Sequence, residues 1–222
     1  MTHRIARTAL AASLALAGLV AAPSAAHACG GGWWPDETVD HRIQGVANAE
    51  KQLEDGHYAA ASGAIIRMIP YIKNYEGTSK DPIARRALRV LAVATARTGG
   101  QLALQRELPQ YLRGTWMGAD GADQQVNLNW AVATLSKAAE EKKDDVVLES
   151  DLALAMARTD GFEAEGRKRL EALAKKDLLT SPEAYAELAK LRAADGDGSG
   201  RTAALERCRA MSDEAETCRM QG

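Results

Sequence analysis

The chain has 222 residues, of which 28 are lysine or arginine and 30 are aspartate or glutamate, so its formal net charge is −2. Nucleic-acid-binding domains carry clustered positive charge that displaces counterions from phosphate, and this balance argues against such a partner. Hydrophobic residues make up 46% of the chain, enough to bury a sizeable core in one domain or one repeat array.

Residues 1–28 have the layout of a secretory signal peptide. Arg4 and Arg7 precede an apolar run over 9–22, and the segment ends in small residues through Ala28. The run is shorter than the roughly 20 apolar residues that a transmembrane helix needs. We therefore expect an exported chain, periplasmic or secreted, without a transmembrane segment.

Cleavage after Ala28 would make Cys29 the first residue of the mature chain. This arrangement resembles a bacterial lipoprotein, in which a diacylglycerol is attached to such a cysteine, and it implies a membrane-anchored form. Pro23 and Ser24 instead suit ordinary signal peptidase, so secretion and lipid attachment at Cys29 both stay open. Residues 29–40 are expected to form a flexible leader.

The stretch LEDGHYAAA places Leu53, Gly56, Tyr58 and Ala61 at fixed intervals. Apolar residues at helical spacing precede Gly56 and resume after it, which predicts two helices joined by a tight turn. Leu53 is expected to pack between the helices, and Gly56 to turn the chain. Tyr58 is expected to cover the turn, and Ala61 to let the two helices approach closely.

Later segments keep the same helical periodicity. Apolar residues at steps of three and four occur in the following ranges: 82–98, 127–143, 146–176 and 181–211. A further helix over 101–112 would be bent or ended by Pro109. Gly100, Gly161 and Gly196 mark turns at uneven intervals, which indicates a degenerate array of four or five helix hairpins.

The stretch around Gly56 resembles the tetratricopeptide repeat, which carries the pattern L-x-x-G-x-Y-x-x-A where its two helices meet. The resemblance implies an all-α fold, a right-handed stack of antiparallel helix hairpins (a TPR-like α-solenoid) with a groove for a peptide or protein partner. We assign this helical repeat domain to residues 41–211 and a C-terminal tail to residues 212–222.

Residues 195–206, DGDGSGRTAALE, satisfy the formula of an EF-hand calcium loop. Asp195, Asp197 and Ser199 stand at the first three ligand positions, and Glu206 stands at the twelfth. The loop resembles an EF-hand and implies a calcium ion bound by these four residues. The same residues also suit an ordinary turn between helices, and both interpretations stay open.

Cys208 and Cys218 are close in sequence, while Cys29 is far from both. In the oxidising conditions that an exported chain meets, the two C-terminal cysteines are expected to form a disulfide. The bridge would fold the tail back over the last helix. Cys29 is then the odd cysteine, with lipid attachment, an intermolecular disulfide or a free thiol as its three fates.

No familiar catalytic motif occurs in the sequence. It lacks H-E-x-x-H, G-x-S-x-G and the phosphate-binding loop, and His41 and His57 are the only histidines after residue 28. We therefore expect a non-enzymatic scaffold or adaptor that binds a protein or peptide, with no cofactor unless calcium binds. Two alternatives are a calcium-binding protein and an enzyme of unrecognised type. The partner and the oligomeric state are not specified by the sequence.

Overall fold

The computed structural model describes residues 40–75, 79–102, 121–212 and 217–219. The signal peptide, nearly all of the leader, Cys29 and most of the predicted helix over 101–112 lie outside this part of the chain. Residues 39–222 belong to one packed unit, and only that unit is considered below. Within the described residues all regular structure is helical and no strand occurs, which confirms the all-α class.

The helices are, in chain order, α1 (His41–Glu54), α2 (Tyr58–Met68), the 3₁₀ helix η1 (Ile72–Tyr75), α3 (Pro82–Arg97), α5 (Gly121–Glu141), α6 (Val146–Ala157), α7 (Glu163–Ala174), α8 (Pro182–Ala194) and α9 (Gly198–Met211). In the ranges given above, no helix is long and apolar enough to cross a membrane.

Side-chain caps explain where most of these helices begin. Five helices start after a residue whose side-chain oxygen accepts a hydrogen bond from a backbone N–H of the first turn: Asp40, Asp81, Asp145, Ser181 and Asp197. Such a cap satisfies one of the free donors at a helix start and typically stabilises the helix by about 1 kcal/mol. Proline follows the cap in α3 and α8, where its fixed φ suits the first helical position.

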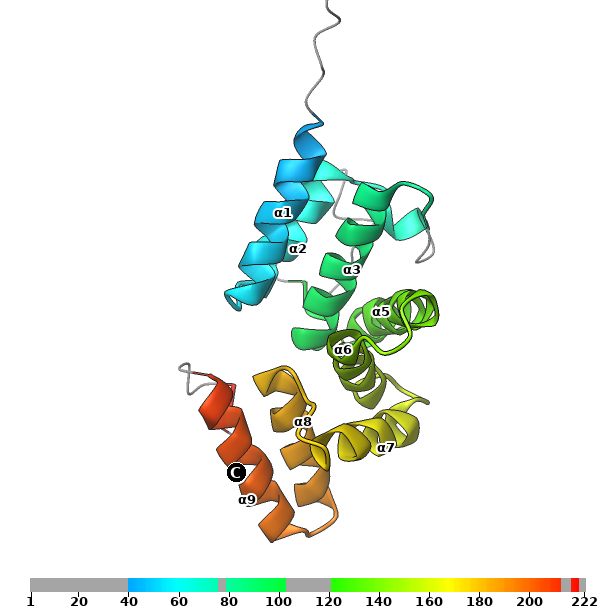
Figure 1. The fold of residues 1–222 in the computed structure, drawn as a ribbon. Coiled ribbons are helices and arrows are strands. Elements are labelled where there is room, and N and C mark those ends of the chain that lie inside the picture. Colours follow the sequence, from blue (N-terminus) through cyan, green and yellow to red (C-terminus); the bar gives the residue numbers. More distant parts are fainter. Residues whose placement is uncertain (1–39, 76–78, 103–120, 213–216, 220–222) are drawn as a thin grey trace, which may run out of the picture. The chain divides into compact units, whose positions relative to one another are not determined.

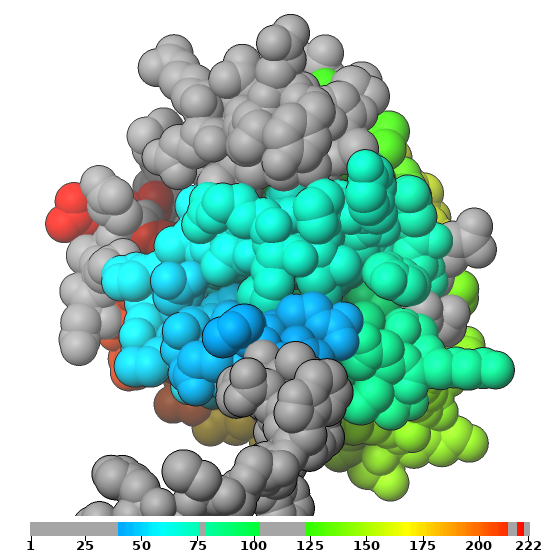
Figure 2. Space-filling view, turned by 90° about the horizontal axis from the view of Figure 1, so that it is seen from above, coloured from blue at the N-terminus to red at the C-terminus, as the bar shows by residue number. Residues whose placement is uncertain are grey.

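The helices pack as successive pairs: α1 with α2, α3 with α5, α6 with α7, and α8 with α9 (Figure 1). The first helix of each pair also packs on the first helix of the next, in the order α1, α3, α6, α8. The second helix of each pair contacts the first helix of the following pair. Seen from above, the first helix pair and the segment that follows it occupy the centre of the view, and later parts of the chain appear at its edges (Figure 2).

Two glycines show how the pairs are built. Gly56, in the α1–α2 turn, has φ +80°, and a Cβ built there would meet nothing within 4 Å. Glycine is needed at this position for its left-handed backbone rather than for space. Gly166 is different, because its Cβ would lie 2.1 Å from the backbone nitrogen of Ala157. The backbones of α6 and α7 therefore approach as closely as glycine allows.

Buried apolar side chains run through all the pairs. One group joins α1, α2 and α3, a second joins α3, α5 and α6, and a third joins the helices from α6 to α9. Leu53 and Trp130 pack against both the first and the second group. An ion pair between Glu171 of α7 and Arg192 of α8, 2.6 Å apart, adds a polar link near the third group.

Candidate functional site

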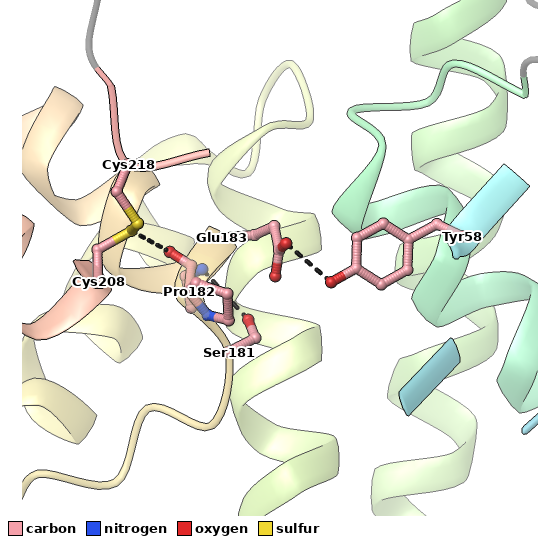
Figure 3. Close-up of a disulfide and its surroundings, with 7 residues drawn as sticks. Tyr58, Ser181, Pro182, Glu183, Cys208 and Cys218 are labelled. Atoms are coloured by element: carbon pink, nitrogen blue, oxygen red, sulfur yellow. Dashed lines mark hydrogen bonds between the residues drawn. A yellow bond between two sulfur atoms is a disulfide. The ribbon is translucent and has the colours of Figure 1, made fainter. Parts of the chain in front are cut away.

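The first and last helix pairs meet through a hydrogen bond. Tyr58 is the first residue of α2, placed there by the turn at Gly56, and its hydroxyl donates to Glu183 Oε1 at 2.8 Å (Figure 3). Glu183 is held near the start of α8, where Ser181 caps the helix and Pro182 occupies its first position. Residues 125 positions apart in sequence thus face each other.

Arg97, the last residue of α3, extends this contact into a cluster. Its guanidinium lies 2.9 Å from the carboxylate of Asp151 on α6 and 5.6 Å from the ring centre of Tyr58. The side chains of Arg97 and Asp151 are only 12% and 2% exposed. We call Tyr58, Arg97, Asp151 and Glu183 the inner polar cluster, which joins four helices: α2, α3, α6 and α8.

The inner polar cluster has one cation for two carboxylates. Burial and the neighbouring Glu183 raise the pKa of Tyr58 to about 12, so its hydroxyl remains a hydrogen-bond donor at neutral pH. Burial also raises the pKa of Asp151, and the nearby Glu183 acts in the same direction while Arg97 opposes it. Arg97 is thus shared: it pairs with Asp151, and the nearby Glu183 also raises the pKa of its guanidinium, while Glu183 forms no ion pair among the described residues.

Glu183 is also incompletely hydrogen-bonded. The residue is 5% exposed, and no donor among the described residues reaches its second carboxylate oxygen, Oε2. The hydroxyl of Thr180, three residues earlier, is likewise buried without a partner in the described chain. Buried polar atoms are nearly always hydrogen-bonded, and an unpaired one is costly. Two such atoms, three residues apart in sequence, lie at the start of α8.

Glu187, one helical turn further along α8, shows the ordinary arrangement. It is also 5% exposed, but Arg158 Nε donates to Oε2 at 2.8 Å and Lys190 Nζ donates to Oε1 at 3.2 Å. Arg158 further donates to the backbone carbonyls of Ala96 and Arg97. Both oxygens of Glu187 are thus partnered, and its role is to hold α8 against the ends of α3 and α6.

Glu183 lines a cavity of about 600 Å³. Its walls come from the α1–α2 turn, the end of α3, the start of α8 and the chain after α9: Glu54, Asp55, Gly56, Tyr58, Arg97, Thr180, Pro182, Glu183, Met211, Ser212 and Thr217. Two neighbouring cavities of about 320 and 440 Å³ share Arg97 as a lining residue. A cavity with a few convergent polar groups is the usual form of a binding site.

No protein-family model, curated protein or solved structure matches this chain.

The four residues of the repeat signature are brought to the α1–α2 hairpin. Leu53 is partly buried between two core groups, and Ala61 is fully buried. Gly56 has the left-handed backbone that a tight turn needs. Tyr58 also makes a contact that was not expected, because its hydroxyl reaches Glu183 on the last helix pair. A hydrogen-bond partner 125 residues away is invisible to a local pattern.

The four residues of the EF-hand-like loop are not gathered around one point. Asp197 caps α9 and accepts from Ser199 Oγ at 2.9 Å, while Asp195 pairs with Arg167 of α7. Helix α9 already begins at Gly198, so Glu206 lies well inside it with an exposed side chain. The described residues include no group of three His, Cys, Asp or Glu side chains able to hold a metal ion. Calcium binding stays a prediction.

The two C-terminal cysteines lie at disulfide distance, with Sγ atoms 2.03 Å apart, and both are fully buried. Cys208 Sγ lies 3.2 Å from the carbonyl oxygen of Pro182 (Figure 3). An oxidised sulfur has no proton to donate, so this is a packing contact. The bridge holds the chain after α9 at the start of α8, and Thr217 becomes part of the cavity wall.

Arg97, Asp151 and Glu183 were not singled out from the sequence, although one signal for Arg97 exists. After residue 28, the tripeptide Ala-Arg-Thr occurs at 96–98 and at 157–159, each time shortly before a turn glycine. Both arginines form an ion pair with a helix of the following pair. Arg97 pairs with Asp151, five residues after the start of α6, and Arg158 pairs with Glu187, five residues after the start of α8. The repeated tripeptide therefore corresponds to a repeated ion pair.

Proposed function

We propose that this protein is an exported, non-enzymatic scaffold that binds a peptide segment of a partner protein in the 600 Å³ cavity. Residues 41–211 would act as a degenerate TPR-like α-solenoid whose inner surface carries this cavity. Export as a periplasmic or secreted protein is part of the proposal, and lipid attachment at Cys29 is the alternative form of it.

The packing pattern supports the repeat part of the proposal. The most extensive contacts between pairs join neighbouring pairs, in the order α1, α3, α6, α8, as a stack of helix hairpins requires. The repeated pairing of Arg97 with Asp151 and of Arg158 with Glu187 supports the same conclusion, because equivalent positions make equivalent contacts.

The observation that carries the binding role is the unpartnered Oε2 of Glu183 in the wall of the cavity. A buried group without a partner lowers stability, and such a cost is common where a surface serves a ligand rather than the fold. Tyr58 is held protonated and Arg97 is engaged with Asp151. These side chains are therefore arranged to recognise a group and not to transfer protons.

Site-specific photo-crosslinking tests this function. A photo-reactive residue replaces Met211, which lines the cavity and is 41% exposed, and in a matched variant replaces Phe162, which is 40% exposed and lines none of the three cavities. In the native envelope, the Met211 variant should give a discrete adduct with one partner, and the Phe162 variant should not. Equal adducts at both positions, or none at Met211, would refute a partner in the cavity.

A further inference from the structure

The cavity wall is electronegative. Glu54, Asp55 and Glu183 line it, against Arg97 as the single lining cation among the described residues. Arg97 is already engaged with Asp151, and Asp55 pairs with Lys51 at 2.9 Å. Glu183, whose Oε2 lacks a hydrogen-bond partner, and the exposed Glu54 are the two lining carboxylates that form no ion pair among the described residues.

We infer that the cavity receives a basic side chain, the guanidinium of an arginine or the ammonium of a lysine, from the bound peptide. Its N–H groups donate to Glu183 Oε2 and to the hydroxyl of Thr180, two buried atoms without a partner in the described chain that belong to residues lining the cavity. The inference rests on the proposed function, since it specifies the chemistry of the peptide.

Charge and shape both favour this occupant. A carboxylate or phosphate would face Glu54 and Glu183 with no cation except the paired Arg97 among the described lining residues, whereas a basic group completes a charge-assisted hydrogen bond. Met211 and Pro182 supply apolar surface in the same cavity, against which the methylene stem of the basic side chain can pack. Tyr58 holds Oε1 of Glu183 and so fixes the orientation of the carboxylate.

The test uses a short blocked peptide with one central arginine and a second peptide with citrulline in its place. Citrulline keeps the shape of arginine and removes the charge. Binding to the purified protein is followed by NMR titration of the backbone amides. The arginine peptide should shift the amides of Tyr58, Glu183 and Met211, and the citrulline peptide should bind at least about tenfold more weakly, the loss expected for one charge-assisted hydrogen bond.

A matched pair of variants assigns the charge to one residue. Glu183→Gln keeps an acceptor for Tyr58 but removes the negative charge, and it should weaken the arginine peptide about tenfold or more. Glu187→Gln removes an equally buried charge one turn away, outside the cavity, and should leave peptide binding unchanged. Equal affinity for both peptides, or equal behaviour of the two variants, would overturn the inference.

Competition with spermidine shows whether the cavity recognises a basic side chain of a peptide or a free polyamine. If it competes with the arginine peptide but binds more weakly, the site recognises a basic group within a peptide, as inferred. If spermidine binds tightly and neither the arginine peptide nor its lysine counterpart binds, the peptide source is wrong. A partner that still crosslinks through Met211 to the Glu183→Gln variant would leave the proposed function intact and refute only the basic side chain.

Discussion

The effects of Glu183→Gln and Glu187→Gln on stability show whether each carboxylate stabilises the fold or is available to a ligand. Both residues lie on α8 and are 5% exposed. Glu187 pairs with Arg158 and Lys190, whereas Glu183 Oε2 has no donor among the described residues. In the absence of any ligand, we expect Glu187→Gln to destabilise the protein and Glu183→Gln to leave its stability unchanged or to raise it.

The magnitudes follow from the contacts. Glu187→Gln weakens a buried hydrogen bond between charged groups, about 1.5–3 kcal/mol, while Arg158 keeps its two backbone carbonyl acceptors. For a protein of this size, 1 kcal/mol corresponds to about 2–4 °C in Tm, so Tm should fall by roughly 3–12 °C. Glu183→Gln preserves the acceptor for Tyr58 and removes the repulsion between Glu183 and Asp151. Its Tm should therefore not fall.

Thermal unfolding of the two variants and the wild type, followed by circular dichroism under one buffer condition, decides the question. A fall in Tm for Glu183→Gln as large as that for Glu187→Gln would refute the reasoning. Glu183 would then be an ordinary member of a structural ion-pair network, balanced by Arg97.

Three further predictions concern the fold. Gly56→Ala should destabilise the protein by about 1–2 kcal/mol because φ is +80° there, whereas Gly198→Ala, at a helical position with nothing within 4 Å of the added Cβ, should stabilise it slightly in the same denaturant titration. A hydrogen bond from Arg192 on α8 lowers the pKa of Glu171. Glu171 therefore contributes stability above its unfolded pKa of about 4.3, and this contribution is lost as the pH falls through its folded pKa. Between about pH 5 and pH 3, the stability of the Glu171→Gln variant should fall less steeply than that of the wild type. Reducing the Cys208–Cys218 bridge should cost at most about 2.7 kcal/mol, since the loop it closes is short, and a protein whose unfolding free energy is the same before and after reduction would show that the bridge does not constrain the unfolded chain.

The sequence predicted the helices well because their signals are local. The period of the apolar residues and the turn at Gly56 each involve neighbours only a few residues apart. The structure ends α1 just before Gly56 and begins α2 just after it. The pairing of Cys208 with Cys218 was predictable for the same reason of proximity.

The inner polar cluster was beyond such reasoning because it depends on tertiary contacts. Nothing near Tyr58 in sequence indicates a glutamate 125 residues away. The burial of Arg97 and Asp151 could not be predicted from the sequence either, since charged residues are mostly exposed. Only the recurrence of Ala-Arg-Thr before the turns hinted that these arginines have a shared structural role. In the loop that resembles an EF-hand, Asp197 caps α9 and Asp195 pairs with Arg167.

The hydrogen bond between Tyr58 and Glu183 also sets an order of events during folding. The extensive helix contacts join helices of the same pair or of neighbouring pairs, and contacts between segments close in sequence form quickly because little chain entropy is lost in closing them. Tyr58 and Glu183 are 125 residues apart, so we expect their hydrogen bond to form after the helices between them have packed. We therefore expect a refolding chain to regain its helices before it regains the complete cavity.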